Sequence, residues 1–96
     1  MNRFVLQAQL TERAALRYTP AGVPALDLRL AHASTLTEDG LPRQVAFEMR
    51  ALALGAITRP IAELTLGGQA VFAGFMAAAR NGRGLLFHVT SLDASA

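Results

Sequence analysis

The clearest constraint on the fold of this chain is a strict alternation of apolar and polar residues after position 25. Leu26, Leu28 and Leu30 share one face of an extended segment, whereas Asp27 and Arg29 lie on the other face. Successive side chains of a β-strand point to opposite faces, so a period of two indicates a strand with one face in the core.

Four further segments alternate in a similar way, so the sequence predicts five strands. The others are Phe4–Leu10, Arg43–Leu54, Gln69–Ala78 and Leu85–Leu92. Between the second and third strands, Ser34–Pro42 contains Thr, Glu, Asp, Gly and Pro, and we expect an exposed loop there.

The segments between the strands predict the rest of the architecture. Pro20–Pro24 is predicted to turn, and Ala14–Thr19 either continues the first strand after a bend or forms a separate β segment. In Gly55–Leu66 the apolar spacing favours a short helical turn with Pro60 near its start. The tail Asp93–Ala96 is expected to fray.

Five short-spaced strands, with one helical turn between the third and fourth, give the order of elements in an OB-fold. We therefore predict an all-β, five-stranded OB-fold barrel that occupies residues 1–96 as a single domain. An SH3-like barrel would satisfy the periodicity almost as well. Strand parity places four of the five phenylalanines in the core and Phe72 at the surface or an interface; the four are Phe4, Phe47, Phe75 and Phe87.

Composition excludes several classes of protein. The chain has no cysteine, which excludes disulfides and thiolate metal sites, and its two histidines have no metal-ligand spacing. No acid–base constellation or glycine-rich phosphate loop is present, so an enzyme and a bound cofactor are not expected. No run is long enough to span a membrane, which predicts a cytoplasmic protein, and the 52% hydrophobic content predicts a subunit interface.

All nine basic residues are arginines, although the net charge is only +2. Arginine forms forked hydrogen bonds to phosphate and stacks on bases, so the location of these residues decides what they could bind. Arg80 and Arg83 flank the Asn81-Gly82 turn between the last two strands, where they could clamp phosphates or simply be solvated charges.

Several short motifs, taken in order and spacing, make the chain resemble the family of primosomal replication protein N, PriB, more than the related SSB proteins. They are Asn2–Leu6, Pro20–Pro24, Leu30–His32, Gly40–Gln44, Met49, Gly74-Phe75 and Asn81-Gly82. The resemblance covers nearly the whole chain. It implies an OB-fold homodimer that binds single-stranded DNA and bridges the PriA helicase to DnaT during replication restart.

The resemblance also implies binding residues. The family stacks bases on two aromatic residues that flank the Arg-Gln pair, but Leu41 and Ala46 hold those positions here. Since stacking contributes roughly 1–3 kcal/mol per base, we expect weaker binding. The matching basic positions are Arg43 and the tip arginines, and the residue that could supply a stacking ring in compensation is Tyr18.

Two further arginines, Arg17 and Arg50, are weaker candidates, because Arg50 could pair with Glu48 on its own face. Arg43 could likewise pair with Glu38 or Asp39. The missing stacking aromatics at Leu41 and Ala46, together with Glu48 on the presumed DNA-binding face, favour a second hypothesis, in which the chain is mainly a protein-interaction subunit of the primosome with weak or marginal DNA binding.

Overall fold

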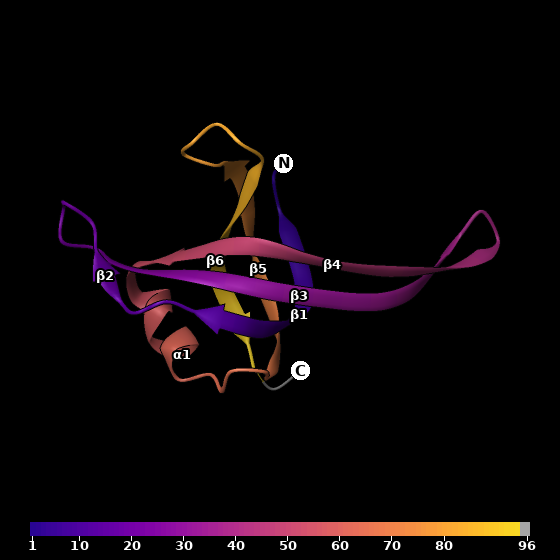
Figure 1. Ribbon diagram of the computed structural model, residues 1–96, viewed down its shortest axis with the longest axis horizontal. Coiled ribbons are helices and arrows are strands. Elements are labelled where there is room, and N and C mark those ends of the chain that lie inside the picture. Colours follow the sequence, from indigo (N-terminus) through magenta and orange to yellow (C-terminus); the bar gives the residue numbers. More distant parts are fainter. Residues whose placement is uncertain (95–96) are drawn as a thin grey trace.

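The longest feature of the molecule is an antiparallel hairpin formed by β3 (Pro24–Glu38) and β4 (Leu41–Leu54). The two strands pair without a register break from Ala25↔Leu54 to Glu38↔Leu41. The computed structural model describes residues 1–94 and extends 49 Å along its long axis. Figure 1 shows the distal half of the hairpin projecting from the rest of the chain; we call this part, residues 32–47, the arm.

The remaining strands close a barrel around the proximal half of this hairpin. β1 (Phe4–Arg13) pairs first with β5 (Gln69–Ala78) and then, from Gln9 onward, with β3. β6 (Leu85–Asp93) joins β5 to β4, and its pairing with β4 is parallel. A two-residue strand, β2 (Arg17–Tyr18), borders β3. The order β1-β5-β6-β4-β3, closed by β1–β3, confirms the predicted OB-fold barrel.

A short helical segment closes one end of the barrel. A 3-10 turn (Gly55–Ile57) leads into α1 (Thr58–Ala62), between the third and fourth long strands as predicted. Ile61 is fully buried against the core. Arg13 donates hydrogen bonds to the carbonyl oxygens of Ile61 and Leu64, at 3.1 and 2.6 Å, and so satisfies acceptors at the helix end. Among residues 1–94, no helix is long and apolar enough to cross a membrane.

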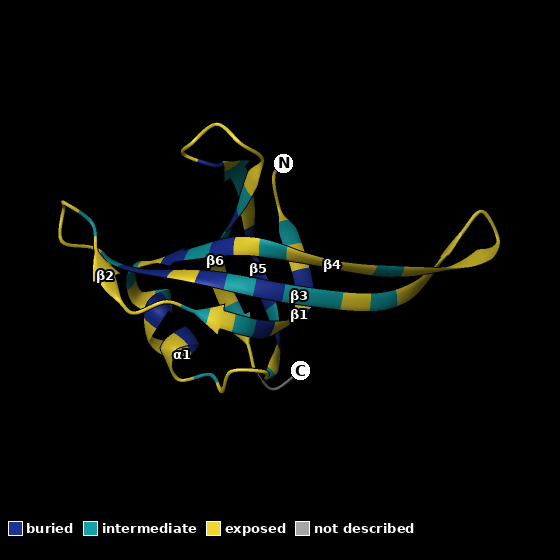
Figure 2. Cartoon of the chain, viewed as in Figure 1, coloured by how far each residue is buried: buried dark blue, intermediate teal, exposed yellow. Residues whose placement is uncertain are grey.

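The predicted loop at Ser34–Pro42 is wrong. β3 continues through Thr35, Leu36 and Thr37, whose β-branched and apolar side chains favour extended backbone, and only Asp39 and Gly40 turn. Both turn residues have positive φ, 51° and 75°, as a two-residue hairpin turn of this kind requires. Figure 2 shows the consequence: burial decreases along the arm, which has no core beneath it.

The predicted positions of three phenylalanines are also wrong. Phe72 is fully buried, whereas Phe47 and Phe75 are each 39% exposed. Phe47 lies on the core-facing side of β4 but beyond the end of the barrel. On β5, Phe72, Gly74 and Met76 face inward, so Phe75 faces outward. The predictions for Phe4 and Phe87 are confirmed, because Phe4 packs against the core and Phe87 is fully buried.

The predicted terminal hairpin is confirmed within one residue. Its strands pair from Val71↔Asp93 to Ala78↔Leu85, with a register shift after Ala73. Of the predicted frayed tail, Asp93 ends β6, and residues 95 and 96 lie outside the described part of the chain.

The inward position of Phe72 and the outward position of Phe75 predict different costs of truncation. We expect Phe72→Ala to lower the free energy of unfolding by about 3–5 kcal/mol, because it opens a cavity in the core. The matched variant Phe75→Ala should cost about 1 kcal/mol, because its ring is partly solvated already. Urea denaturation followed by circular dichroism measures both. Equal losses would contradict the assigned faces of β5.

Candidate nucleic-acid interface

OB-fold proteins bind oligonucleotides on the face of their second and third strands, between the loops that follow the first and fourth strands. In this chain those strands are β3 and β4, the first loop contains β2, and the second is the tip between β5 and β6. Figure 1 shows this tip above the β3–β4 hairpin, with β2 near one end of the hairpin and the arm at the other.

The β5–β6 tip is an ordered turn that presents two arginines. Gly82 N–H donates to the Ala79 carbonyl oxygen at 2.9 Å, and Arg83 N–H donates to the Asn81 side-chain oxygen at 2.9 Å. Gly82 has a φ of 72°, as the Asn-Gly sequence predicts for such a turn. Arg80 and Arg83 are exposed, and neither forms an ion pair with any residue in the described range.

On the outer face of the sheet, Arg50 of β4 lies directly opposite Arg29 of β3. Arg29 donates to Glu12 at 3.3 Å, whereas Arg50 forms no ion pair within residues 1–94. The expected pairing of Arg50 with Glu48 is therefore not formed. Like charges directly opposite each other are unfavourable, and an anion between them would relieve the repulsion.

Sequence reasoning missed Arg29 as a candidate. The signal for it was the Asp39-Gly40 turn, because this turn alone fixes the register that places position 29 opposite position 50.

Arg17 and Tyr18 are adjacent on β2, but Arg17 is held in an ion pair, whereas the ring of Tyr18 is exposed. Arg17 forms a two-pronged contact with Asp27, with nitrogen–oxygen distances of 2.7 and 3.2 Å. These hydrogen bonds hold the pKa of the Asp27 carboxyl below its ordinary value; partial burial opposes the shift, and the charges of Arg17 and Arg50 support it. Tyr18 is 65% exposed, so its ring is open to a ligand.

Arg43 lies away from the other candidates, on the arm. It forms an ion pair with Glu38 at 3.2 Å, which is one of the two alternatives expected from sequence. Position 43 also lies on the opposite side of the sheet from position 50, since odd and even residues of β4 face opposite ways. The structure therefore places five of the six predicted residues on the barrel or its β5–β6 tip and Arg43 on the arm, and it does not bring the six into one patch.

The two positions that carry stacking aromatics in the resembling family are open to solvent here. Leu41 is 67% exposed and Ala46 is exposed, so a base could reach either position. Neither side chain has an aromatic ring, and the loss of two stacking platforms stays a prediction.

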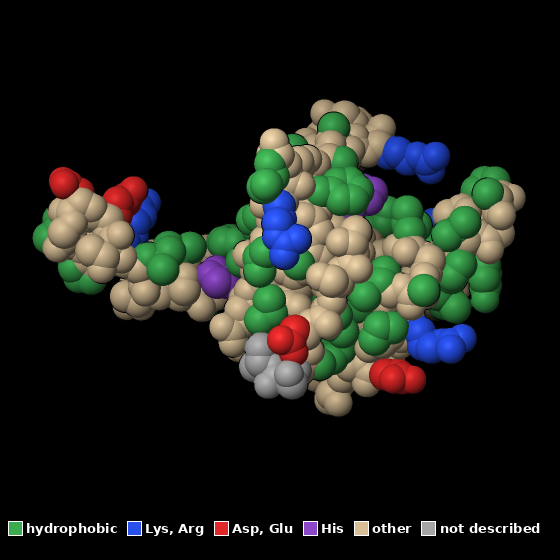
Figure 3. Space-filling model, turned by 180° about the vertical axis from the view of Figure 1, so that it is seen from behind, with side chains coloured by type: hydrophobic (Ala, Val, Ile, Leu, Met, Phe, Trp, Pro, Cys, Tyr) green, Lys and Arg blue, Asp and Glu red, His purple; other side chains and the backbone are tan. Residues whose placement is uncertain are grey.

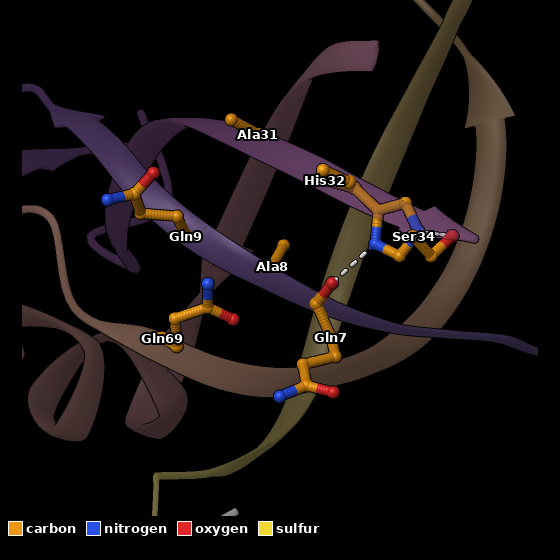
Figure 4. Close-up of a pocket in the computed structure, with 8 residues that line it drawn as sticks. Gln7, Ala8, Gln9, Ala31, His32, Ser34 and Gln69 are labelled. Carbon is orange, nitrogen blue, oxygen red and sulfur yellow. Dashed lines mark hydrogen bonds between the residues drawn. The ribbon is translucent and has the colours of Figure 1, made fainter. Parts of the chain in front are cut away.

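A shallow pocket of about 280 Å³ lies where β1 separates from β3 (Figure 4). The ring of His32 spans the gap: Nδ1 lies 2.6 Å from the Gln7 carbonyl oxygen, and Nε2 lies 2.8 Å from the Ser34 hydroxyl. Three glutamines, from β1 and β5, complete the polar lining. In the described part of the chain, no group of three or more His, Asp or Glu side chains is placed to hold a metal ion.

The Arg17–Asp27 pair predicts a pH dependence of stability. Because the pKa of Asp27 is lowered in the folded protein, the stabilisation is complete above the ordinary value of about 3.9 and is lost as the pH falls through the lower folded value. We expect Asp27→Asn to be slightly less stable than the wild type at pH 7, and we expect the difference to shrink as the pH falls below about 3.9. Both side chains are half-exposed, which keeps the effect small.

Urea midpoints at several pH values measure this difference, with Glu63→Gln as the control. Glu63 is an exposed carboxylate without an ion pair in residues 1–94, so its variant should follow the wild type at every pH. A stability difference for Asp27→Asn that persists unchanged at pH 2 would contradict the assigned role of the pair.

Comparison with known proteins shows the family to which this chain is similar. The model of "another single-strand binding protein family" matches residues 2–91. The replication restart protein PriB of Bordetella pertussis is 44% identical over 80 residues, which cover 83% of this chain and 75% of the relative. PriB of Nitrosomonas europaea is 32% identical over 76 residues, covering 79% and 70% of the two chains.

Comparison with solved structures identifies similar proteins of the same kind. PriB from Ralstonia solanacearum superposes with a TM-score of 0.89 at 34% identity, covering 100% of this chain and 99% of that one. The single-stranded DNA binding protein from Thermus aquaticus gives 0.75 at 28% identity, covering 97% and 49%. The family consists of binding proteins rather than enzymes, in agreement with the sequence. The chain belongs to the PriB proteins of the SSB-like, single-strand binding OB-fold family.

Proposed function

We propose that this chain binds single-stranded DNA as an accessory protein of replication restart. The observation that carries the proposal is the set of three exposed arginines without ion pairs in the described range, Arg50, Arg80 and Arg83, on the surface that OB-folds use for oligonucleotides. The names of the PriB and single-stranded DNA-binding relatives support it.

Charge, rather than aromatic stacking at the family positions, supplies most of the affinity in this proposal. Arg17, Arg29 and Arg43 are engaged by carboxylates, and Arg13 is engaged by helix carbonyls. The tip therefore holds the largest concentration of free positive charge near the binding face. Tyr18, which is exposed on β2, offers one ring at another edge of that face.

We further propose that the chain acts as one OB-fold domain over residues 1–96, in the cytoplasm, and as a homodimer. Between Phe4 and Ala8, β1 has a strand partner on one side only, because its pairing with β3 begins at Gln9. An unpaired strand edge is a template for another strand, and a second copy of β1 would satisfy it. A dimer would also double the number of tip arginines along one DNA strand.

The partners in this proposal are the PriA helicase and DnaT, which are implied by membership of the PriB family.

One observation favours the second candidate function, that of a protein-interaction subunit with marginal DNA binding. The arm exposes large apolar side chains where no core lies beneath them: Leu36, Leu41 and Phe47 are 57%, 67% and 39% exposed. Tight binding to the helicase together with barely measurable binding to oligo-dT would favour this second function over the first.

The double variant Arg80→Ala/Arg83→Ala tests the tip directly. Each phosphate contact on a single strand contributes about 0.7 to the slope of log K against log salt, so we expect weaker oligo-dT binding and a slope lower by about 1.4. Fluorescence polarisation at several salt concentrations measures both quantities. Arg59→Ala, which removes an exposed arginine from α1, is the control and should change neither. An unaltered slope in the double variant would exclude the tip as a phosphate clamp.

A further inference from the structure

A stacked pair of rings lies on the outer face of the β5–β6 hairpin. The pair is located where β6 also pairs with β4, and we call this part of the hairpin its root. The ring centroids of Phe75 and His88 are 4.8 Å apart, and the ring planes differ by 11°. The two residues are direct cross-strand partners. Phe75 is 39% exposed and His88 is partly exposed, so the pair forms part of the molecular surface.

The backbone beneath these rings is built for a close approach of the two strands. A Cβ atom added at Gly74 would collide with the backbone carbonyl of His88, so only glycine fits there. On the inner face, the next cross-strand pair is Met76 with Phe87, which anchors the hairpin in the core. The two strands that carry the outer rings are therefore held together by the inner-face packing of Met76 and Phe87 and by the close approach at Gly74.

The chain contains a second histidine–phenylalanine contact, and the comparison is informative. His32 and Phe47 lie 5.2 Å apart with planes tilted by 34°, and both ring nitrogens of His32 are hydrogen-bonded within the chain. That pair has a structural explanation. The ring of His88 has no hydrogen-bond partner among residues 1–94, and its parallel stacking on Phe75 leaves a flat aromatic surface that the fold does not use.

The position of the pair relates it to the arginine tip. Phe75 and His88 lie three cross-strand pairs from the last pair of the hairpin, Ala78 and Leu85, which is about 10 Å along the strands. Figure 3 shows histidine, arginine and apolar side chains gathered at the end of the molecule that carries this tip. Proteins that bind single strands combine such aromatic rings with nearby basic groups, which hold bases and phosphates respectively.

We infer that Phe75 and His88 form a base-stacking platform for single-stranded DNA. A base lies on the open face of the ring pair, and the phosphates that follow it reach Arg80 and Arg83. The platform lies on a different strand pair from positions 41 and 46 and supplies aromatic contact that those positions lack. This inference rests on the proposed function and adds a second kind of contact to it.

Oligo-dT and an abasic oligonucleotide of the same length separate the two kinds of contact. We expect Phe75→Leu to weaken binding to oligo-dT about five- to tenfold, because leucine keeps apolar bulk but removes the ring. Binding to the abasic strand and the salt slope should stay at their wild-type values. Phe75→Tyr should retain oligo-dT binding. Phe47→Leu, which removes an equally exposed phenylalanine from the arm, is the matched control and should not change it.

A crosslinking experiment on the unaltered protein makes the test independent of any variant's folding. A 5-iododeoxyuridine strand should crosslink to a peptide that contains Phe75 or His88. Failure to crosslink there, an oligo-dT affinity of Phe75→Leu within twofold of wild type, or an equal loss for the abasic strand would each overturn the platform. If the wild type binds oligo-dT in those cases, only this inference falls. If the wild type binds no single strand at all, the proposed function falls with it.

Discussion

The unbroken pairing of β3 with β4 is the constraint on which the rest of the structure depends. Fourteen cross-strand pairs follow from one two-residue turn at Asp39-Gly40, so every side chain on both strands has its face and its neighbour fixed at once. Leu28 faces Ala51 in the core, and Arg29 faces Arg50 outside it. A shift of one residue would exchange these two sets and would place arginines in the barrel.

The same register explains why the arginines differ in availability. The chain carries nearly as many carboxylates as arginines, seven against nine, and strand pairing decides which of them meet. Arg17, Arg29 and Arg43 each find a carboxylate at 2.7–3.3 Å, on β3 or on β1 beside it. The tip between β5 and β6 contains no acidic residue, and its arginines form no ion pair with any residue from 1 to 94. The local sequence thus concentrates accessible positive charge at the tip, although the net charge of the whole chain is low.

Most of the fold could be predicted from the sequence, because period-two alternation, turn residues and the short helical segment are local signals. The arm could not, since Ser34–Thr37 is polar enough to resemble a loop and its strand character depends on pairing with Pro42–Val45. The parity of β5 also failed, because Ala73, Gly74 and Phe75 offer apolar candidates on both faces. The Arg17–Asp27 and Phe75–His88 contacts join distant segments, so no local pattern identified them.

The division of labour within the β5–β6 hairpin follows from its two faces. The inner residues Met76 and Phe87 hold the root against the core, and Gly74 brings the strands together, so the outer rings are fixed before any ligand arrives. Ordering a flexible side chain on binding costs about 0.5–1.5 kcal/mol, and a ring that is already stacked avoids most of that cost. The arm offers no such support beneath Leu41 and Ala46. We therefore infer that a base contact requires less ordering at the hairpin root than it would on the arm, and that the proposed DNA strand reaches from the root to the arginines of the tip.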